Sequence, residues 1–264
     1  MKGVAAAAAA VLATPEPFEK AMAARALALA WRQRRLAHSF DVRMPDRPAR
    51  PERPALVAAT AMPKRGRAGS PKTRFAMLHA LAHIEFNAID LAVDIAGRFG
   101  AGMPRAFVDD WLGVAADEAM HFALVARRLK SLGGSYGDLP AHDGLWQSAG
   151  DTADCVLARL AVVPMVLEAR GLDVTPAMVA RFEAAGDERS AAILRRILRD
   201  EVRHVAAGVR WFGFAARLQR FDPATEWQRL VGARFRGRIK PPFNDSARDE
   251  AGLTRDFYQP IAAV

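Results

Sequence analysis

The chain has 264 residues, of which 51% are hydrophobic and 25% are charged, with a formal net charge of +9. This balance excludes a disordered chain and is typical of a globular protein that buries a sizeable core. The single cysteine, Cys155, excludes a disulfide within the chain and favours a reducing, cytoplasmic location.

The first 35 residues predict a helical N-terminus. The alanine-rich residues 1–13 lack the Leu, Ile and Phe content of a signal peptide, so we interpret them as a frayed end rather than a leader. A helix is expected over 15–35, where apolar residues recur. No later stretch reaches the ~20 uninterrupted apolar residues of a membrane span, and none is predicted.

The positive charge is concentrated in the next stretch. Residues 31–74 contain twelve lysines or arginines and three acidic residues, an excess equal to the net charge of the whole chain. Six prolines interrupt residues 40–71, which predicts an extended arm over the surface. Two interpretations stay open. The arm either wraps its own helices and pairs with their acids, or binds RNA, an anionic membrane or an acidic partner.

Helices dominate the rest of the chain. Ser70-Pro71 is a strong start signal, and glycine pairs or prolines separate the later segments. Helices are predicted over 71–98, 104–131, 151–169, 176–185, 187–216 and 223–234, with a crossing loop over 132–150, a helix end at Gly171, a cap at Asp187 and an irregular tail from Lys240. The fold class is therefore all-α.

Two matched sets of metal-ligand residues stand in this pattern. Glu85 precedes Glu118-x-x-His121 by 33 residues, and Glu168 precedes Glu201-x-x-His204 by the same 33. A four-helix bundle that holds two metal ions uses this set, with one Glu from each of two helices and a Glu-x-x-His from each of the others.

The surroundings of the four glutamates favour the same interpretation. Each lies in the middle of an apolar stripe at helical spacing, where an unpaired carboxylate would cost several kcal/mol. A pair of divalent cations would neutralise the four charges. We predict two iron ions, with manganese or a mixed pair also open because both metals accept carboxylate and imidazole. Ordinary surface glutamates are the alternative.

Both Glu-x-x-His motifs follow an aspartate, Asp117 and Asp200. A metal-bound histidine usually donates its other N–H to a carboxylate. We expect Asp117 to hold His204 and Asp200 to hold His121 across the bundle, with an outward ion pair as the alternative.

With these residues the sequence resembles the ferritin-like di-iron superfamily. Asp200-Glu201-x-Arg203-His204 resembles the Asp-Glu-x-Arg-His motif of oxygen-activating di-iron enzymes, whereas the first copy has Met120 in place of the arginine. Residues 69–258 are similar to an uncharacterised bacterial ferritin-like family, domain-of-unknown-function family 455. That similarity rests on the segments 79–90, 161–173 and 241–244. The resemblance implies a ferritin-like four-helix bundle over 71–216, preceded by an N-terminal helix and arm (1–70) and followed by a C-terminal helix and tail (217–264).

Four further residues receive local interpretations. His79 and His83 face away from the proposed ligands and are expected to make structural hydrogen bonds. Pro164 should kink its helix one turn before Glu168. Gly208 lies one turn past His204 and is expected to leave room for substrate.

Three functions follow as hypotheses. The first is an O2-activating di-iron oxidoreductase that acts on an unknown small organic substrate with an electron donor. The second is an iron-handling protein, either a ferroxidase, an iron buffer or a peroxide scavenger. The third is an RNA-modifying enzyme of the tRNA hydroxylase kind, supported by the basic arm alone. The sequence leaves the catalytic residues unassigned and the oligomeric state open, with a dimer as the candidate.

Overall fold

The computed structural model describes residues 1–62 and 69–263. In this part of the chain the regular structure is helical, with no β-strand and two isolated bridges, Gly3–Ala37 and Leu56–Ala141. The predicted all-α class is therefore confirmed. The helices form two compact units, Met1–Trp146 and Gln147–Val264, each of which is a packed helical bundle. The three-part division predicted from the sequence, at residues 70 and 216, stays a prediction.

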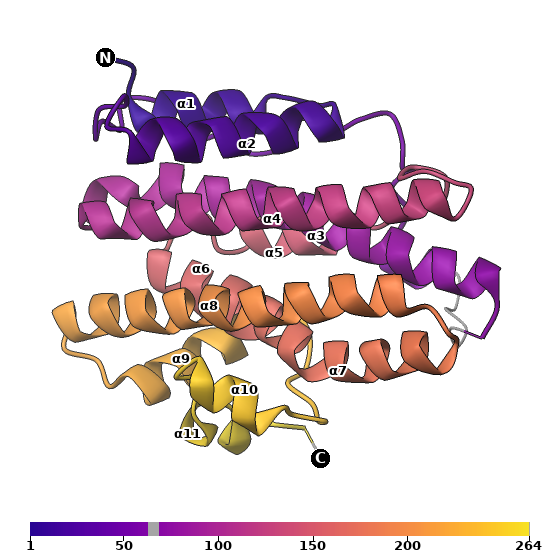
Figure 1. Cartoon of the computed structure of the whole chain (residues 1–264). Coiled ribbons are helices and arrows are strands. Elements are labelled where there is room, and N and C mark those ends of the chain that lie inside the picture. Colours follow the sequence, from indigo (N-terminus) through magenta and orange to yellow (C-terminus); the bar gives the residue numbers. More distant parts are fainter. Residues whose placement is uncertain (63–68, 264) are drawn as a thin grey trace. The chain divides into compact units, whose positions relative to one another are not determined.

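The first unit is built around a helical hairpin. Helices α3 (Pro71–Phe99) and α4 (Arg105–Ser131) are joined by the short 3-10 turn η2 (Gly100–Gly102) and therefore run antiparallel. Helix α2 (Pro17–Arg32) packs mainly on α4, and α1 (Val4–Leu12) packs on α3 (Figure 1). The predicted helices over 15–35, 71–98 and 104–131 are confirmed.

The alanine-rich N-terminus is a packed helix, so its interpretation as a frayed end was wrong. Val4, Ala5 and Ala8 are fully buried in α1. A Cβ added to Gly97 of α3 would lie 3.1 Å from the Cβ of Ala8. Small side chains on both helices thus permit a close approach, and close packing buries the alanine side chains of α1.

The arm after α2 lies against its own unit. Apart from the 3-10 turn η1 (Ala59–Ala61), its described residues have no regular helix, as expected. Met44 is buried, and Arg98 of α3 donates to the carbonyl of Pro45 at 2.8 Å. Trp146 donates to the carbonyl of Asp46. Lys64, Arg65 and Arg67 of the predicted basic arm lie outside the described residues.

The predicted crossing loop over 132–150 is only partly a loop. Helix α5 (Gly144–Gly150) occupies its second half and spans the boundary between the units. It buries Trp146 and Ala149. A segment of seven residues shows too little periodicity to be recognised from the sequence.

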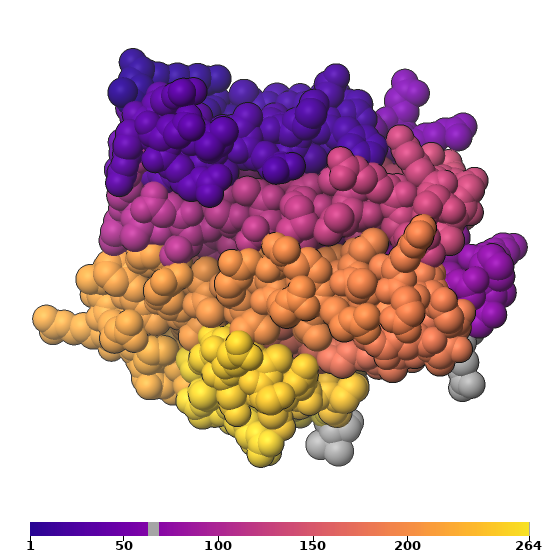
Figure 2. Space-filling model, in the orientation of Figure 1, coloured from indigo at the N-terminus to yellow at the C-terminus, as the bar shows by residue number. Residues whose placement is uncertain are grey.

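The second unit is built around α8 (Glu188–Leu218), which packs against α7 (Ala169–Ala184), α6 (Val156–Val162) and the π-helical segment η3 (Val163–Glu168). Asp187 caps α8 as predicted, because its carboxylate accepts from the N–H of Ser190 at 3.0 Å. Helix α9 (Pro223–Arg234) packs on α6. Side chains of α8 form part of the surface in Figure 2, which fits its opposite apolar and charged faces.

Three helix boundaries predicted for this unit were wrong. The helix expected over 151–169 begins at Val156, and α7 runs through Gly171 and Pro176 without a break. A Cβ at Gly171 would meet nothing within 4 Å, so this glycine is an ordinary helical position. The tail from Lys240, predicted as irregular, contains the short helices α10 (Asp245–Glu250) and α11 (Arg255–Tyr258), followed by η4 (Gln259–Ile261).

Pro164 changes the helix type before Glu168. The proline has no N–H, and its ring excludes normal helical pairing with the preceding turn. The N–H of Ala169 donates to the carbonyl of Pro164, five residues earlier, which is the π-helical pattern. The predicted irregularity at Pro164 is confirmed, and its form is a π-helix of six residues rather than a simple kink.

Gly208 does not leave room for substrate, which corrects the prediction. A Cβ on Gly208 would lie 2.5 Å from the Cβ of Pro164 and 2.6 Å from its Cγ. The proline ring of η3 therefore fills the space over this glycine, and α8 approaches η3 closely at this point.

We expect Gly208→Ala to destabilise the protein by about 1–3 kcal/mol, because the added methyl group clashes with the rigid ring of Pro164. Urea unfolding followed by circular dichroism measures this change. Gly232→Ala in α9 is the control, since a Cβ there meets nothing within 4 Å and should stabilise the helix slightly. Equal stability of the wild type and Gly208→Ala would contradict the close approach.

Candidate metal centre

The hairpin of the first unit places Glu85, Glu118 and His121 together. Ser70 starts α3 with a reciprocal capping box, in which its hydroxyl accepts from the N–H of Thr73 at 3.2 Å. The short turn η2 then returns the chain as α4. Since Glu85 and Glu118 stand at similar distances from this turn, the antiparallel arrangement brings them level.

These three side chains converge at distances suited to one metal ion. His121 Nδ1 lies 3.3 Å from Glu85 Oε2 and 3.4 Å from Glu118 Oε2. All three residues are buried, with 2% or less of their surface exposed. Two donor atoms that each lie about 2.1 Å from one ion are about 3.0–3.4 Å apart at octahedral or tetrahedral angles. The geometry of this set therefore fits a bound cation.

The charge state of His121 reflects the two carboxylates. Burial by itself lowers the pKa of His121, but Glu118 and Glu85 together outweigh burial and raise the pKa to about 11. Without a metal ion, a proton on the imidazole thus offsets part of the negative charge. A metal ion at the same place would replace that proton, because a ligating imidazole nitrogen must be deprotonated.

The second unit brings Glu168, Glu201 and His204 together. Each offers a ligand atom, and these atoms lie within 4.8 Å of one another. Glu168 is the last residue of η3, while Glu201 and His204 stand one turn apart on α8. His204 Nδ1 lies 3.7 Å from Glu201 Oε1. Glu201 and His204 are buried and Glu168 is half-buried.

Each unit thus contains a buried or half-buried group of two carboxylates and one imidazole that could bind a metal ion. The donor set is oxygen and nitrogen without sulfur, which suits iron, manganese or zinc better than soft metals. The role of the six residues as ligands stays a prediction, as does the joining of the two sets in one dinuclear centre.

The two aspartates that precede the motifs differ in their surroundings. Asp200 is buried and accepts from Arg196 and Arg203 of its own helix, both at 2.6 Å. Asp117 is half-buried on α4. The predicted pairs of Asp117 with His204 and of Asp200 with His121 stay a prediction.

His79 and His83 make structural hydrogen bonds, as predicted. His79 Nε2 accepts from the N–H of Gly137 at 2.9 Å. His83 Nδ1 lies 2.9 Å from the hydroxyl of Tyr136, whose ring stacks on both histidines. Burial lowers the pKa of His83 to about 4, so its imidazole is neutral at physiological pH.

A buried charge cluster on α3 was not predicted from the sequence. Lys20 of α2 donates to Asp90 of α3 at 2.7 Å, and neither side chain is exposed to solvent. Arg50 of the arm pairs with the same aspartate and donates to Asn87 at 2.6 Å. The only sequence signal was a pair of charges, Lys20 and Asp90, within apolar helix faces.

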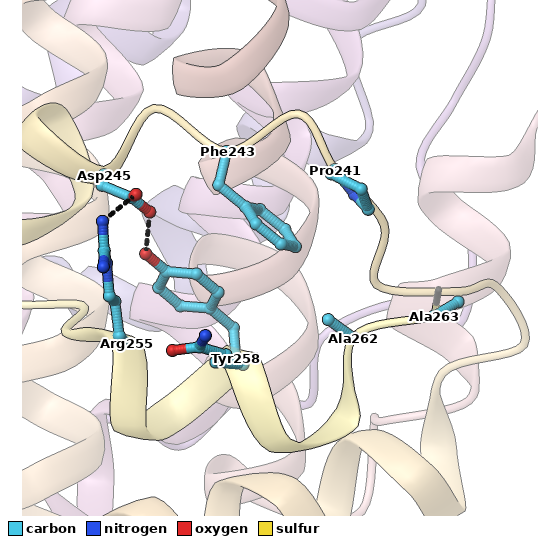
Figure 3. Close-up of a pocket in the computed structure, with 8 residues that line it drawn as sticks. Pro241, Phe243, Asp245, Arg255, Tyr258, Ala262 and Ala263 are labelled. Carbon is cyan, nitrogen blue, oxygen red and sulfur yellow. Dashed lines mark hydrogen bonds and ion pairs between the residues drawn. The ribbon is translucent and has the colours of Figure 1, made fainter.

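A hollow of about 390 Å³ lies in the C-terminal segment of the second unit. The rings of Phe243 and Tyr258 form one wall, and Asp245 pairs there with Arg255 (Figure 3). None of the predicted ligands lines this hollow.

No helix among the described residues combines the length and the apolar character needed to cross a membrane.

Comparison with known proteins gives two matches. The model of a family described as "protein of unknown function (DUF455)" matches residues 13–259. An uncharacterized protein of Haemophilus influenzae (strain ATCC 51907 / DSM 11121 / KW20 / Rd) is 44% identical over 211 residues, which cover 78% of this chain and 73% of that protein. No solved structure matches the chain.

Proposed function

The chain belongs to the DUF455 family, and we propose that it is a dinuclear metal-carboxylate protein that activates O2 to oxidise a small organic substrate. In this proposal the two ligand sets act as one centre with two iron ions. The proposed ligands are Glu85, Glu118, His121, Glu168, Glu201 and His204.

One observation carries the proposal. Each compact unit brings one glutamate and one Glu-x-x-His pair within ligand distance, and both sets have the same sequence separation of 33 residues. A lone set of this kind is common among helices. Two matched sets supply the four carboxylates and two imidazoles of a two-metal helical site.

The side chains define what such a centre can do. Within each unit three residues could hold an ion, fewer than the six ligands that octahedral iron or manganese takes, so a bound ion would have positions left for O2 and substrate. Two ferrous ions bound there would supply the electrons that reduce O2. Buried apolar residues around Glu85 and Glu118, among them Ala82, Ile89 and Phe122, would keep water away from an ion held there.

The basic arm gives less support to an RNA substrate. Arg50 pairs with Asp90, and Arg47 lies 3.9 Å from Asp143. Part of the arm's charge is thus used inside its own unit, which supports the interpretation of a wrapping segment. A steep salt dependence of RNA binding would be the sign of the RNA-modifying alternative.

Metal content tests the proposal. Wild type from iron-replete cells is expected to hold about two iron ions per chain, and Glu118→Ala/Glu201→Ala close to none, because one carboxylate is removed from each set. Glu183→Ala is the matched control, since Glu183 is exposed and pairs with Arg195 outside both sets. A wild type that lacks metal while keeping its helical circular dichroism would contradict the proposal.

Oxygen consumption then separates the two metal-dependent functions. Anaerobic ferrous protein is mixed with O2, and the ratio of O2 consumed to iron added is measured. An oxidoreductase should stop near one O2 per centre until a reductant is supplied. A ferroxidase should continue to oxidise added ferrous iron over many turnovers, and that result would favour the iron-handling alternative.

A further inference from the structure

Helix α7 contains a proline whose missing hydrogen bond is replaced from the C-terminal segment. Pro176 has no N–H and cannot donate to the carbonyl of Leu172, four residues earlier. The side-chain amide of Asn244 donates to that carbonyl at 3.1 Å instead. The helix therefore continues through Pro176 because a distant residue satisfies its backbone.

An ion pair holds α7 one residue further along. Arg248 of α10 donates to Asp173 through Nε at 2.8 Å and through Nη2 at 2.7 Å. The N–H of Asn244 also donates to Asp173, at 3.0 Å. Arg248 and Asp173 are both buried, so this bidentate pair is not screened by solvent.

A third residue of α7, Arg170, also forms hydrogen bonds with the C-terminal segment. Arg170 Nη1 donates to the carbonyl of Lys240 at 2.9 Å and to that of Pro242 at 3.0 Å. We call residues 240–248, with these contacts to residues 170–173, the C-terminal clasp. Every contact of the clasp falls two to five residues after Glu168.

The C-terminal clasp holds the part of α7 that directly follows Glu168. Glu168 ends the π-helical segment η3, an irregular turn that contains Pro164, and α7 begins at the next residue. Contacts that fix the first turn of α7 therefore also bear on the direction of the Glu168 side chain. We infer that the C-terminal clasp positions Glu168 against Glu201 and His204 of α8. The consequence for metal binding rests on the proposed function, whereas the hold on the backbone does not.

Asp245 of the C-terminal clasp makes two contacts within the C-terminal segment. Asp245 accepts from the hydroxyl of Tyr258 at 2.5 Å and pairs with Arg255 at 2.5 Å, on the side of the hollow (Figure 3). The contacts of Arg255 are with the C-terminal segment itself rather than with residues 170–173. Arg255→Ala is therefore a matched control that removes an arginine contact from the same segment and leaves the grip on α7 intact.

Hydrogen–deuterium exchange of the full-length, metal-free protein tests the hold on the backbone. Asn244→Ser keeps a capping oxygen for α10 but is too short to reach Leu172. Amides of residues 165–175 should exchange about tenfold faster in this variant, the size expected for one buried hydrogen bond. Arg255→Ala should leave them unchanged. Unchanged exchange in Asn244→Ser, or an equal change in both variants, would overturn the inference.

Pro176→Ala supplies an internal check. Alanine restores the N–H that can donate to Leu172, so the amide of Asn244 becomes dispensable. Asn244→Ser should then accelerate exchange less than threefold in the Pro176→Ala background. An undiminished effect would mean that Asn244 acts by another route, and the inference would fall.

Metal titration tests the consequence for Glu168. If the proposed function holds, Asn244→Ser should weaken the binding of one of two metal ions about tenfold or more and leave the other unchanged. Faster exchange with two unaltered affinities would show that the clasp does not position Glu168. A wild type that binds no metal would overturn the proposed function alone, and the exchange comparison would still decide the hold on the backbone.

Discussion

Asp90→Ala is expected to lower the free energy of unfolding by about 3–5 kcal/mol, because it leaves the buried ammonium group of Lys20 without its main partner. Burial raises the pKa of Asp90 and lowers the pKa of Lys20, and their mutual attraction offsets only part of either shift. The pair is therefore costly to bury and far more costly to break. Urea unfolding at neutral pH measures the change.

Two further variants test whether the loss in Asp90→Ala comes from the buried charges. Asp46→Ala removes an ion pair with Arg43 in which both side chains are more than four-fifths exposed, so its effect should be too small to move the unfolding midpoint. Lys20→Met/Asp90→Leu removes the Lys20–Asp90 pair and leaves Arg50 with Asn87 and Asp143, so it should recover part of the stability lost in Asp90→Ala. A loss below about 1 kcal/mol in Asp90→Ala would mean that Lys20 reaches solvent.

Metal binding at the first set is expected to weaken about tenfold for each unit by which pH falls between 9 and 6. The carboxylates of Glu118 and Glu85 raise the pKa of His121 to about 11 against the lowering effect of burial, so the free site carries a proton that the metal must displace. Calorimetric titration with Mn²⁺ in two buffers of different ionisation enthalpy counts the protons released, and at least one is expected.

The raised pKa of His121 also affects the stability of the metal-free protein. This effect runs opposite to the effect of pH on metal binding. A folded-state pKa above the ordinary value of 6.5 contributes stability below pH 6.5, and this contribution is lost as pH rises toward 11. Metal-free protein should thus become less stable over this interval, while metal binding becomes tighter. His79→Gln is the control, because that histidine bonds to Gly137 away from the ligand set. No proton release in the wild type would contradict a ligand role for His121.

Local signals were enough for the parts of the fold that depend on neighbouring residues. Ser70-Pro71 and Asp187 mark helix starts because capping is a contact within one turn. Glu118 and His121 could be recognised together because residues three apart share a helix face. Their partner Glu85 followed from equal hairpin arms, which require only that α3 and α4 are straight and joined by a short turn.

The failures share a different cause. Pro176 looks like a helix break by propensity, yet α7 continues through it because Asn244, 68 residues later, satisfies the backbone at Leu172. Gly208 looked like space, but the ring of Pro164 occupies it. In each case a residue distant in sequence outweighed the local preference, and no periodicity reveals such a partner.

The sequence by itself therefore determined the all-α class, the main helices and the two sets of candidate ligands, since these follow from spacing along a regular helix. Only the tertiary structure decided the packed N-terminal helix, the Lys20–Asp90–Arg50 cluster, the π-helical form of the segment before Glu168, and the C-terminal clasp. These features depend on which distant side chains reach a given backbone or charge. That choice is made by packing and burial of the whole chain, which one-dimensional patterns do not contain.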